Sequence, residues 1–125
     1  MRLLVCGGRD YHDRETVFRE LDKLAPALVI HGGAPCADTL AATWCVATRT
    51  PELRFPAEWS LYGKAAGPLR NQQMLDEGKP TLVLAFPGGR GTADMIRRAR
   101  KAGIPVNNMD NRRGDARVPP ADDGR

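Results

Sequence analysis

Residues 81–92 read Thr-Leu-Val-Leu-Ala-Phe-Pro-Gly-Gly-Arg-Gly-Thr, an apolar run that passes directly into a glycine-rich turn. The run 81–86 is typical of a buried strand, and three glycines within positions 88–91 favour φ > 0 and close approach to a bulky group. Residues 93–99 place apolar side chains at helical spacing, and Thr92 before them is a good N-cap residue. The stretch therefore predicts a strand, a glycine turn and the start of a helix in series.

The turn between this strand and helix is a predicted phosphate site. The first backbone N–H groups of a helix lack partners within it and point outward with the positive end of the helix dipole, which suits an anion. The turn lacks the Lys-Ser/Thr ending of a P-loop and the Gly-x-Gly-x-x-Gly spacing of a dinucleotide fingerprint. A merely tight strand-to-helix turn is the alternative. The predicted phosphate-binding residues are Pro87, Gly88, Gly89, Arg90, Gly91 and Thr92.

The composition is that of an ordinary globular protein. The chain has 125 residues, 42% of them hydrophobic and 27% charged, which predicts one domain with a real core. No apolar run approaches the roughly 20 residues that span a bilayer, and no signal-peptide pattern is present, so we expect a cytoplasmic protein without a membrane partner. The net charge of +4 permits phosphate-bearing partners without demanding nucleic acid.

The three cysteines give no sign of a metal site. Cys6, Cys36 and Cys45 form no CxxC pair, and their spacing to the histidines matches no known ligand set. We interpret them as small buried hydrophobic residues in a reducing compartment. The sequence therefore predicts neither a metal nor a cofactor.

The unit of strand, glycine pair and helix occurs twice earlier in the chain. Residues 2–6 and 27–31 are apolar runs that end in glycine pairs. Helices are predicted from about Asp13 to before Pro26, and from about Cys36. The second helix carries a core stripe of Ala37, Leu40, Ala41, Trp44, Cys45 and Thr48.

The second half of the chain continues the alternation. Residues 53–55 form a weaker strand, 56–67 an irregular loop, and a helix runs from Pro68 at its first position to about Gly78. A last short strand at 104–106 contains a proline, which suggests an edge position.

This alternation predicts an α/β domain at residues 1–110 with a doubly wound, mainly parallel sheet of about five strands. Residues 111–125 lack apolar periodicity and are predicted to be a disordered tail. Ligands of such sheets bind outside the carboxyl ends of the strands, where strand order reverses. The three glycine turns follow residues 6, 31 and 86, and we therefore expect them to share one cleft.

Several further side chains are candidates for this cleft. Asp38 falls in the first turn of its helix, where it either favours the helix dipole or accepts a ribose hydroxyl. Arg70 is either a bidentate phosphate clamp or a surface arginine, and Asn71 and Met74 can share its side of the helix. In the loop 56–67, Trp59 or Tyr62 can stack on a nucleobase, although Trp59 can equally anchor the loop on the core.

Four separated motifs resemble the YspA-like branch of the SLOG superfamily. They are Val-Cys-Gly-Gly-Arg-Asp-Tyr at 5–11, His-Gly-Gly-Ala at 31–34, the segment 59–74, and Ala-Phe-Pro-Gly-Gly-Arg-Gly-Thr at 85–92. The superfamily includes Lonely Guy phosphoribohydrolases, nucleotide-sensing domains and DprA. The resemblance covers residues 2–107 and implies a Rossmann-like fold that binds a nucleotide. Beyond the phosphate turn, the implied ligand-binding residues are Gly7, Gly8, Arg9, Gly32, Gly33, Asp38, Asn71 and Met74.

The resemblance also bears on catalysis. In the phosphoribohydrolases, an arginine in an Arg-x-x-x-Met helix and a glutamate three residues after the threonine contribute to cleavage of the N-glycosidic bond. Arg70 and Met74 match the first element. The position of the glutamate is Met95, and the nearest carboxylate is Asp94, which projects about 100° away on a helix. Arg70 and Asp94 are therefore the candidate catalytic residues, and Asp38 is a further carboxylate that can assist.

The sequence thus predicts a binder of a nucleotide or nucleotide-derived ligand, and leaves open whether it is a phosphoribohydrolase or a non-catalytic sensor. A single-stranded nucleic-acid-binding module similar to DprA is the alternative. It would use Arg90, Arg97, Arg98, Arg100 and Lys101. Because related hydrolases are dimers that build the site from both subunits, we expect a homodimer.

Overall fold

The computed structural model of the chain describes residues 1–110, so the tail predicted at 111–125 lies outside the described residues. Five parallel strands form one sheet in the order β3-β2-β1-β4-β5. Their bounds are Arg2–Cys6 for β1, Leu28–His31 for β2, Glu52–Arg54 for β3, Leu82–Ala85 for β4 and Val106–Asn108 for β5. This order confirms the predicted α/β fold, a Rossmann-like, doubly wound parallel sheet with the last strand at an edge.

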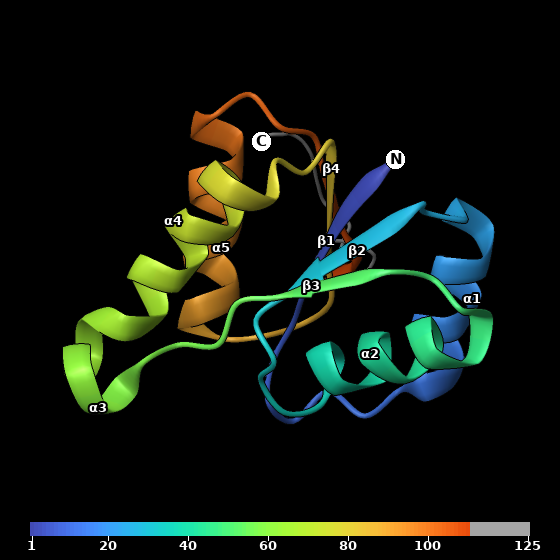
Figure 1. Cartoon of the computed structure of the whole chain (residues 1–125), viewed down its shortest axis with the longest axis horizontal. Helices are drawn as coiled ribbons and strands as arrows, with labels where there is room; N and C mark the ends of the chain where they lie inside the picture. The colour runs from blue at the N-terminus through green and yellow to red at the C-terminus, as the bar shows by residue number, and fades with distance from the viewer. Residues whose placement is uncertain (111–125) are drawn as a thin grey trace.

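Helices cover both faces of the sheet. Figure 1 shows α1 and α2 on one side of the strands and α4 and α5 on the other. Their bounds are Arg14–Leu24 for α1, Ala37–Thr48 for α2, Trp59–Tyr62 for α3, Gly63–Ala65 for the 3-10 helix η1, Ala66–Gly78 for α4 and Arg90–Lys101 for α5. None of the helices within residues 1–110 is long and apolar enough to cross a membrane.

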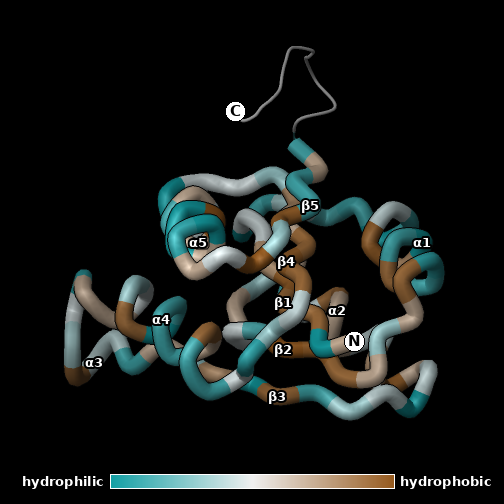
Figure 2. The backbone as a smooth tube through the Cα atoms, turned by 90° about the horizontal axis from the view of Figure 1, so that it is seen from above, coloured by the Kyte–Doolittle hydropathy of each residue, from teal (hydrophilic) through white to brown (hydrophobic). Residues whose placement is uncertain are grey.

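The core lies in two layers because successive strand side chains point to opposite faces. In β1, Leu3 and Val5 pack with α1 and α2, whereas Leu4 and Cys6 pack with α4 and α5. Figure 2 shows the hydrophobic strands enclosed between α1 and the pair α4 and α5. The sheet therefore has no solvent-facing side at its centre, and its strands read as continuous apolar runs.

Helix α1 follows its predicted boundaries closely. Asp13 is the N-cap, and its Oδ1 accepts a hydrogen bond of 3.1 Å from the backbone N–H of Thr16. The helix ends with Ala25 in the left-handed conformation (φ 46°), directly before Pro26. At the other end of the chain, Gly103 (φ 78°) follows α5 in the left-handed conformation that commonly terminates a helix.

Two predicted helix starts are wrong, by three residues for α5 and by two for α4. Helix α5 begins at Arg90 with Gly89 as N-cap, so Thr92 lies in the first turn and is not the cap. Helix α4 begins at Ala66, which makes Pro68 its third residue. A proline is tolerated there because the first four N–H groups of a helix have no internal partner.

Other local predictions also need correction. The segment 56–67 is not an irregular loop throughout, since it contains α3 and η1. Strand β5 begins after Pro105 because proline cannot donate to the ladder. Thr48 is exposed in the last turn of α2, where its hydroxyl donates to the Trp44 carbonyl instead of packing in the core. Cys36 is only half-buried, because its thiol donates to the Arg9 carbonyl at the loop surface.

Candidate functional site

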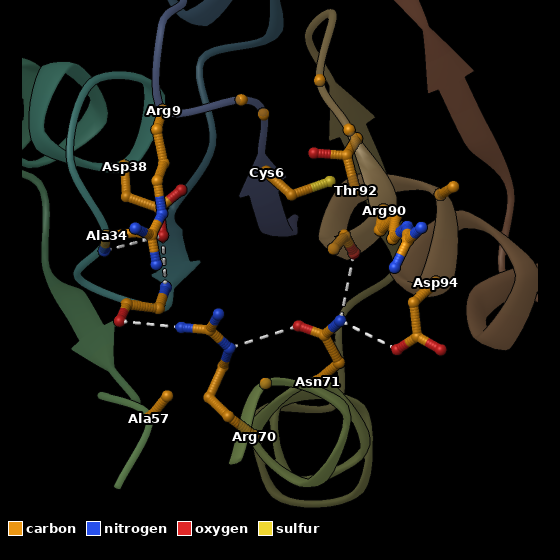
Figure 3. Close-up of a pocket in the computed structure, with 18 of the residues that line it drawn as sticks. Cys6, Arg9, Ala34, Asp38, Ala57, Arg70, Asn71, Arg90, Thr92 and Asp94 are labelled. Carbon is orange, nitrogen blue, oxygen red and sulfur yellow. Dashed lines mark hydrogen bonds between the residues drawn. The ribbon is translucent and has the colours of Figure 1, made fainter. Parts of the chain in front are cut away.

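The cleft lies where the strand order reverses. Strand β1 pairs with both β2 and β4, and the chain leaves the carboxyl ends of β1 and β4 toward opposite faces of the sheet. A cleft of about 1190 Å³ opens between the segments that follow β1, β2 and β4, and α4 closes one side of it (Figure 3). The three glycine turns thus meet in one place, as we expected from the alternation of strands and turns.

Nearly all residues predicted for the site line this cleft. Tyr62 is the exception: it is about half exposed on α3 and does not line the cleft. The predicted residues that line the cleft are Gly7, Gly8, Arg9, Gly32, Gly33, Asp38, Trp59, Arg70, Asn71, Met74, Pro87, Gly88, Gly89, Arg90, Gly91, Thr92 and Asp94. Their contact with a ligand stays a prediction.

The glycines of the β1 and β4 turns have two different roles. The N–H of Gly8 donates to the Pro87 carbonyl at 2.9 Å, so the two turns are hydrogen-bonded to each other. A Cβ on Gly8 would lie 2.9 Å from the Gly88 Cα atom, and one on Gly88 only 2.3 Å from Thr92 Oγ1. These two glycines are therefore required for packing between the turns.

Gly89 and Gly91, in contrast, face open space. Apart from the adjoining residues and the backbone of α5 itself, a Cβ at either position would meet no atom within 4 Å. Gly89 is also the N-cap of α5, and no side chain caps this helix. The positive end of the α5 dipole is thus directed at the cleft without an obstructing side chain, which is the arrangement that binds phosphate groups in other proteins.

A hydrogen-bonded line of side chains crosses the floor of the cleft (Figure 3). Arg70 donates from Nη1 to the Gly32 carbonyl at 3.0 Å and from Nε to Asn71 Oδ1 at 3.2 Å. Asn71 Nδ2 donates in turn to Asp94 Oδ2 at 3.0 Å and to the Gly91 carbonyl at 3.2 Å. Burial lowers the pKa of Arg70, although a guanidinium stays charged at neutral pH. The Nη2 group takes part in neither of the Arg70 bonds.

Both carboxylate oxygens of Asp94 accept hydrogen bonds from neighbouring side chains. Its Oδ1 binds Arg97, and its Oδ2 accepts from Arg98 Nε at 2.8 Å in addition to Asn71. Burial by itself would raise the pKa of this carboxyl, but the hydrogen bonds from Asn71 and Arg98 and the two guanidinium charges hold the pKa below its usual range. Asp94 is therefore an ionised carboxylate that joins α4 to α5.

Asp38 holds the β2 turn. Its Oδ2 accepts from the backbone N–H groups of Gly32 at 2.9 Å and Ala34 at 3.2 Å, and the residue is 5% exposed. Burial raises its pKa in spite of these two hydrogen bonds.

Cys6 also lines the cleft. Burial raises the pKa of its thiol far above the ordinary value, so the thiol stays protonated and contributes an apolar surface instead of a nucleophile.

The sequence reasoning missed several contributors. His31 is 1% exposed, its Nε2 lies 2.6 Å from Glu52 Oε1, and its Nδ1 accepts from the Gly33 N–H at 3.0 Å. Its place at the end of a strand, at the start of the His-Gly-Gly-Ala motif, was the signal for this residue. Arg97 lies three residues after Asp94, a helical spacing that could have paired them. The charged residues that line the cleft are Arg9, Lys64, Arg70, Arg90 and Arg97, with Asp10, Asp38 and Asp94.

The described part of the chain contains no group of three or more His, Cys, Asp or Glu side chains that could hold a metal ion. The cationic side chains of the cleft outnumber its carboxylates, and Asp94 is already paired with Arg97 and Arg98. The cleft is therefore suited to an anionic group.

Comparison with known proteins agrees with this architecture. The chain is 44% identical over 121 residues to the Gene 61 protein of Mycobacterium phage D29, a match that covers 86% of this chain and 95% of the phage protein. Residues 1–62 match the YspA, cpYpsA-related SLOG family. The matched segment contains the turns after β1 and β2, and the remaining turn after β4 completes the same cleft. The chain therefore belongs to the YspA, cpYpsA-related SLOG family.

Proposed function

We propose that this protein binds a nucleotide or nucleotide-derived ligand, with a phosphate group seated against residues 89–92. The observation that carries the proposal is the open space over Gly89 and Gly91 in front of the uncapped start of α5. Membership of a SLOG family agrees with a nucleotide-related ligand. Arg90 lines the same side of the cleft and adds charge that a phosphate can use, whereas Arg97 beside it is already paired with Asp94.

The size of the cleft supports a ligand larger than phosphate alone. Its volume of about 1190 Å³ slightly exceeds the roughly 300–1,000 Å³ that is usual for small-molecule sites. Arg70 lies on the floor between the β2 turn and α5, where its planar fork can reach a phosphate or a ribose oxygen. Trp59 lines the cleft about half exposed beside Gly67, and we propose it as the surface on which the base stacks.

The geometry favours binding over N-glycosidic hydrolysis. Both oxygens of Asp94 are already bound by cationic or amide donors, which leaves this carboxylate poorly placed to orient water or stabilise an oxocarbenium ion. We propose that Asp94 positions Asn71 and Arg97 at the cleft. We therefore propose a nucleotide sensor in preference to an enzyme. Release of free base from AMP would instead identify the protein as a phosphoribohydrolase.

The same contacts disfavour a nucleic-acid module. Arg97 and Arg98 are both engaged by Asp94, and Arg98 also donates to Gln72 at 3.0 Å. Fewer cations of α5 are thus available for a phosphate backbone than the sequence indicates.

We further propose that two copies of the chain associate through α3 and the start of α4. Four large apolar side chains are each about half exposed or more in this segment, and monomers seldom expose such a group. They are Trp59, Leu61, Tyr62 and Leu69. Figure 1 shows α3 at the end of α4, projecting from the body of the fold, where a second copy can reach it.

We also propose a cytoplasmic location for the protein, as expected from the sequence.

Calorimetric titration tests the proposed ligand class directly. We expect AMP or ADP-ribose to bind at low salt and adenosine to bind at least tenfold more weakly, because adenosine lacks the phosphate. Chromatography of the same mixtures detects any free adenine, and a labelled single-stranded oligonucleotide tests the alternative. If no phosphate-bearing nucleotide binds, the proposed function is wrong.

A further inference from the structure

We propose that His31 is a positioning residue that sets the orientation of the Arg70 guanidinium through the Gly32–Gly33 peptide group. The inference rests on the proposed function, because it assigns a role to a residue behind the proposed ligand site. His31 is buried at the end of β2 and does not line the cleft, so it acts only through groups that do.

One peptide group connects the two side chains. Its N–H, from Gly33, donates to His31 Nδ1 at 3.0 Å, and its carbonyl oxygen, from Gly32, accepts from Arg70 Nη1 at 3.0 Å. In Figure 3, dashed lines from the Arg70 guanidinium mark this bond and the bond to Asn71. Because both ends of one planar group are bound, the histidine and the arginine cannot reorient independently.

The ring of His31 is itself held in one tautomer. Since Nδ1 accepts the Gly33 N–H, the ring hydrogen belongs on Nε2, which donates to Glu52 Oε1 at 2.6 Å. The carboxylate of Glu52 on β3 thereby orients the imidazole, as second partners of functional histidines commonly do. The connection runs from Glu52 through His31 and the peptide group to Arg70.

The backbone between these residues needs such a restraint. Gly33 has φ +72°, and a Cβ on Gly32 would lie 1.9 Å from Arg70 Nη1, so the guanidinium packs directly on bare backbone. Two successive glycines impose little conformational preference of their own. Asp38 fixes the peptides on both sides through the Gly32 and Ala34 N–H groups, and the N–H of the Gly32–Gly33 peptide between them is held by His31.

Without the Nδ1 acceptor, the Gly32–Gly33 peptide group would be free to rotate. The Gly32 carbonyl would then turn away from Arg70, and its hydrogen bond to the guanidinium would be lost. The guanidinium would keep its charge but lose one of its two fixed bonds, and a ligand would have to order it on binding. One net hydrogen bond of this kind corresponds to roughly a 3- to 10-fold change in affinity. An effect confined to folding would leave affinity unchanged.

Two amide substitutions test the roles of the His31 Nδ1 and Nε2 atoms separately. His31→Asn keeps an acceptor near the position of Nδ1 and loses the reach to Glu52, whereas His31→Gln reaches toward Glu52 and leaves Gly33 without an acceptor. With AMP as the titrated probe, we expect His31→Gln to weaken binding about 3- to 10-fold and His31→Asn to stay within about twofold of the wild type. Equal affinities of His31→Gln and wild type, or equal losses in both variants, would overturn the inference.

A cycle with Arg70→Met tests whether the effect passes through the arginine. His31→Gln is expected to change AMP affinity in the wild-type background and to have no further effect once Arg70 is Met. An undiminished effect in that background would overturn the inference.

The tautomer provides a readout that needs neither ligand nor folded variants. In long-range ¹H–¹⁵N spectra of the wild-type chain, the His31 ring must carry its hydrogen on Nε2, and the opposite tautomer would overturn the inference. If wild type fails to bind AMP, the proposed function fails, whereas this spectrum still decides the connection to the peptide.

Discussion

Replacing Gly89 with alanine separates ligand binding from folding. The backbone at this position has φ −99°, outside the left-handed region that favours glycine, and the added methyl group meets no residue within 4 Å apart from its neighbours in the chain. Because alanine is a poorer N-cap residue than glycine, we expect Gly89→Ala to lower the free energy of unfolding by about 1 kcal/mol or less. The same methyl group occupies the space in front of α5 where we place the phosphate.

The expected loss of affinity follows from that position. A phosphate displaced from the helix start loses one charge-assisted hydrogen bond or more, each worth about 1.5–3 kcal/mol, which corresponds to roughly a 10- to 150-fold weaker binding. Calorimetry with AMP at fixed ionic strength measures this loss, and urea unfolding of the same preparation measures stability.

Gly88→Ala is the matched control one residue away. Its Cβ would lie 2.3 Å from Thr92 Oγ1 and 2.6 Å from the Gly8 nitrogen, so we expect a stability loss of about 1–3 kcal/mol, as in other overpacked sites. If Gly89→Ala folds normally and still binds AMP like the wild type, the phosphate does not lie at this turn. If Gly89→Ala is as unstable as Gly88→Ala, the open space over Gly89 is refuted.

Three other substitutions test separate parts of the structure. Asp94→Asn is expected to cost about 1–3 kcal/mol at pH 7, nearer the lower figure because the Arg97 side chain is 69% exposed. The pKa of Asp94 is lower in the folded chain than in the unfolded chain, so its stabilisation is present above the ordinary carboxyl pKa and is lost as pH falls through the folded-state pKa. In strong acid, urea unfolding should therefore show the same stability for Asp94→Asn and the wild type. A stability difference that does not change with pH would contradict this. Trp59→Ala should weaken binding of AMP but not of inorganic phosphate, and equal losses for both would remove the stacking role. Leu61→Asp should reduce the mass measured by light scattering from dimer to monomer, and an unchanged dimer would place the interface elsewhere.

The fold was predictable because its signals are local. Apolar runs such as 81–86 end in glycine turns, and each turn precedes a helix, so the alternation alone indicates a parallel sheet with its site at the strand ends. The start of α5 was misplaced by the same local reasoning, because Thr92 has good cap chemistry but Gly89 occupies the cap. Short α3 carries no periodicity long enough to detect.

The electrostatic partners in the cleft were not predictable, because they join distant parts of the chain. Asn71 and Asp94 meet only when α4 packs beside α5, and their bond turns a candidate catalytic carboxylate into a saturated one. His31 and Glu52 meet only when β2 pairs with β3. Such contacts depend on strand order and helix packing, which the residue types in each motif do not encode.

The position of the phosphate can be measured most directly by backbone NMR. In ¹H–¹⁵N spectra of the full chain titrated with AMP, we expect the amide signals of Gly89, Arg90 and Gly91 to shift most strongly, because these groups stand at the open start of α5. Adenosine should leave these three signals in place. Saturating AMP that shifts other amides but not these would contradict a phosphate site at the β4 turn.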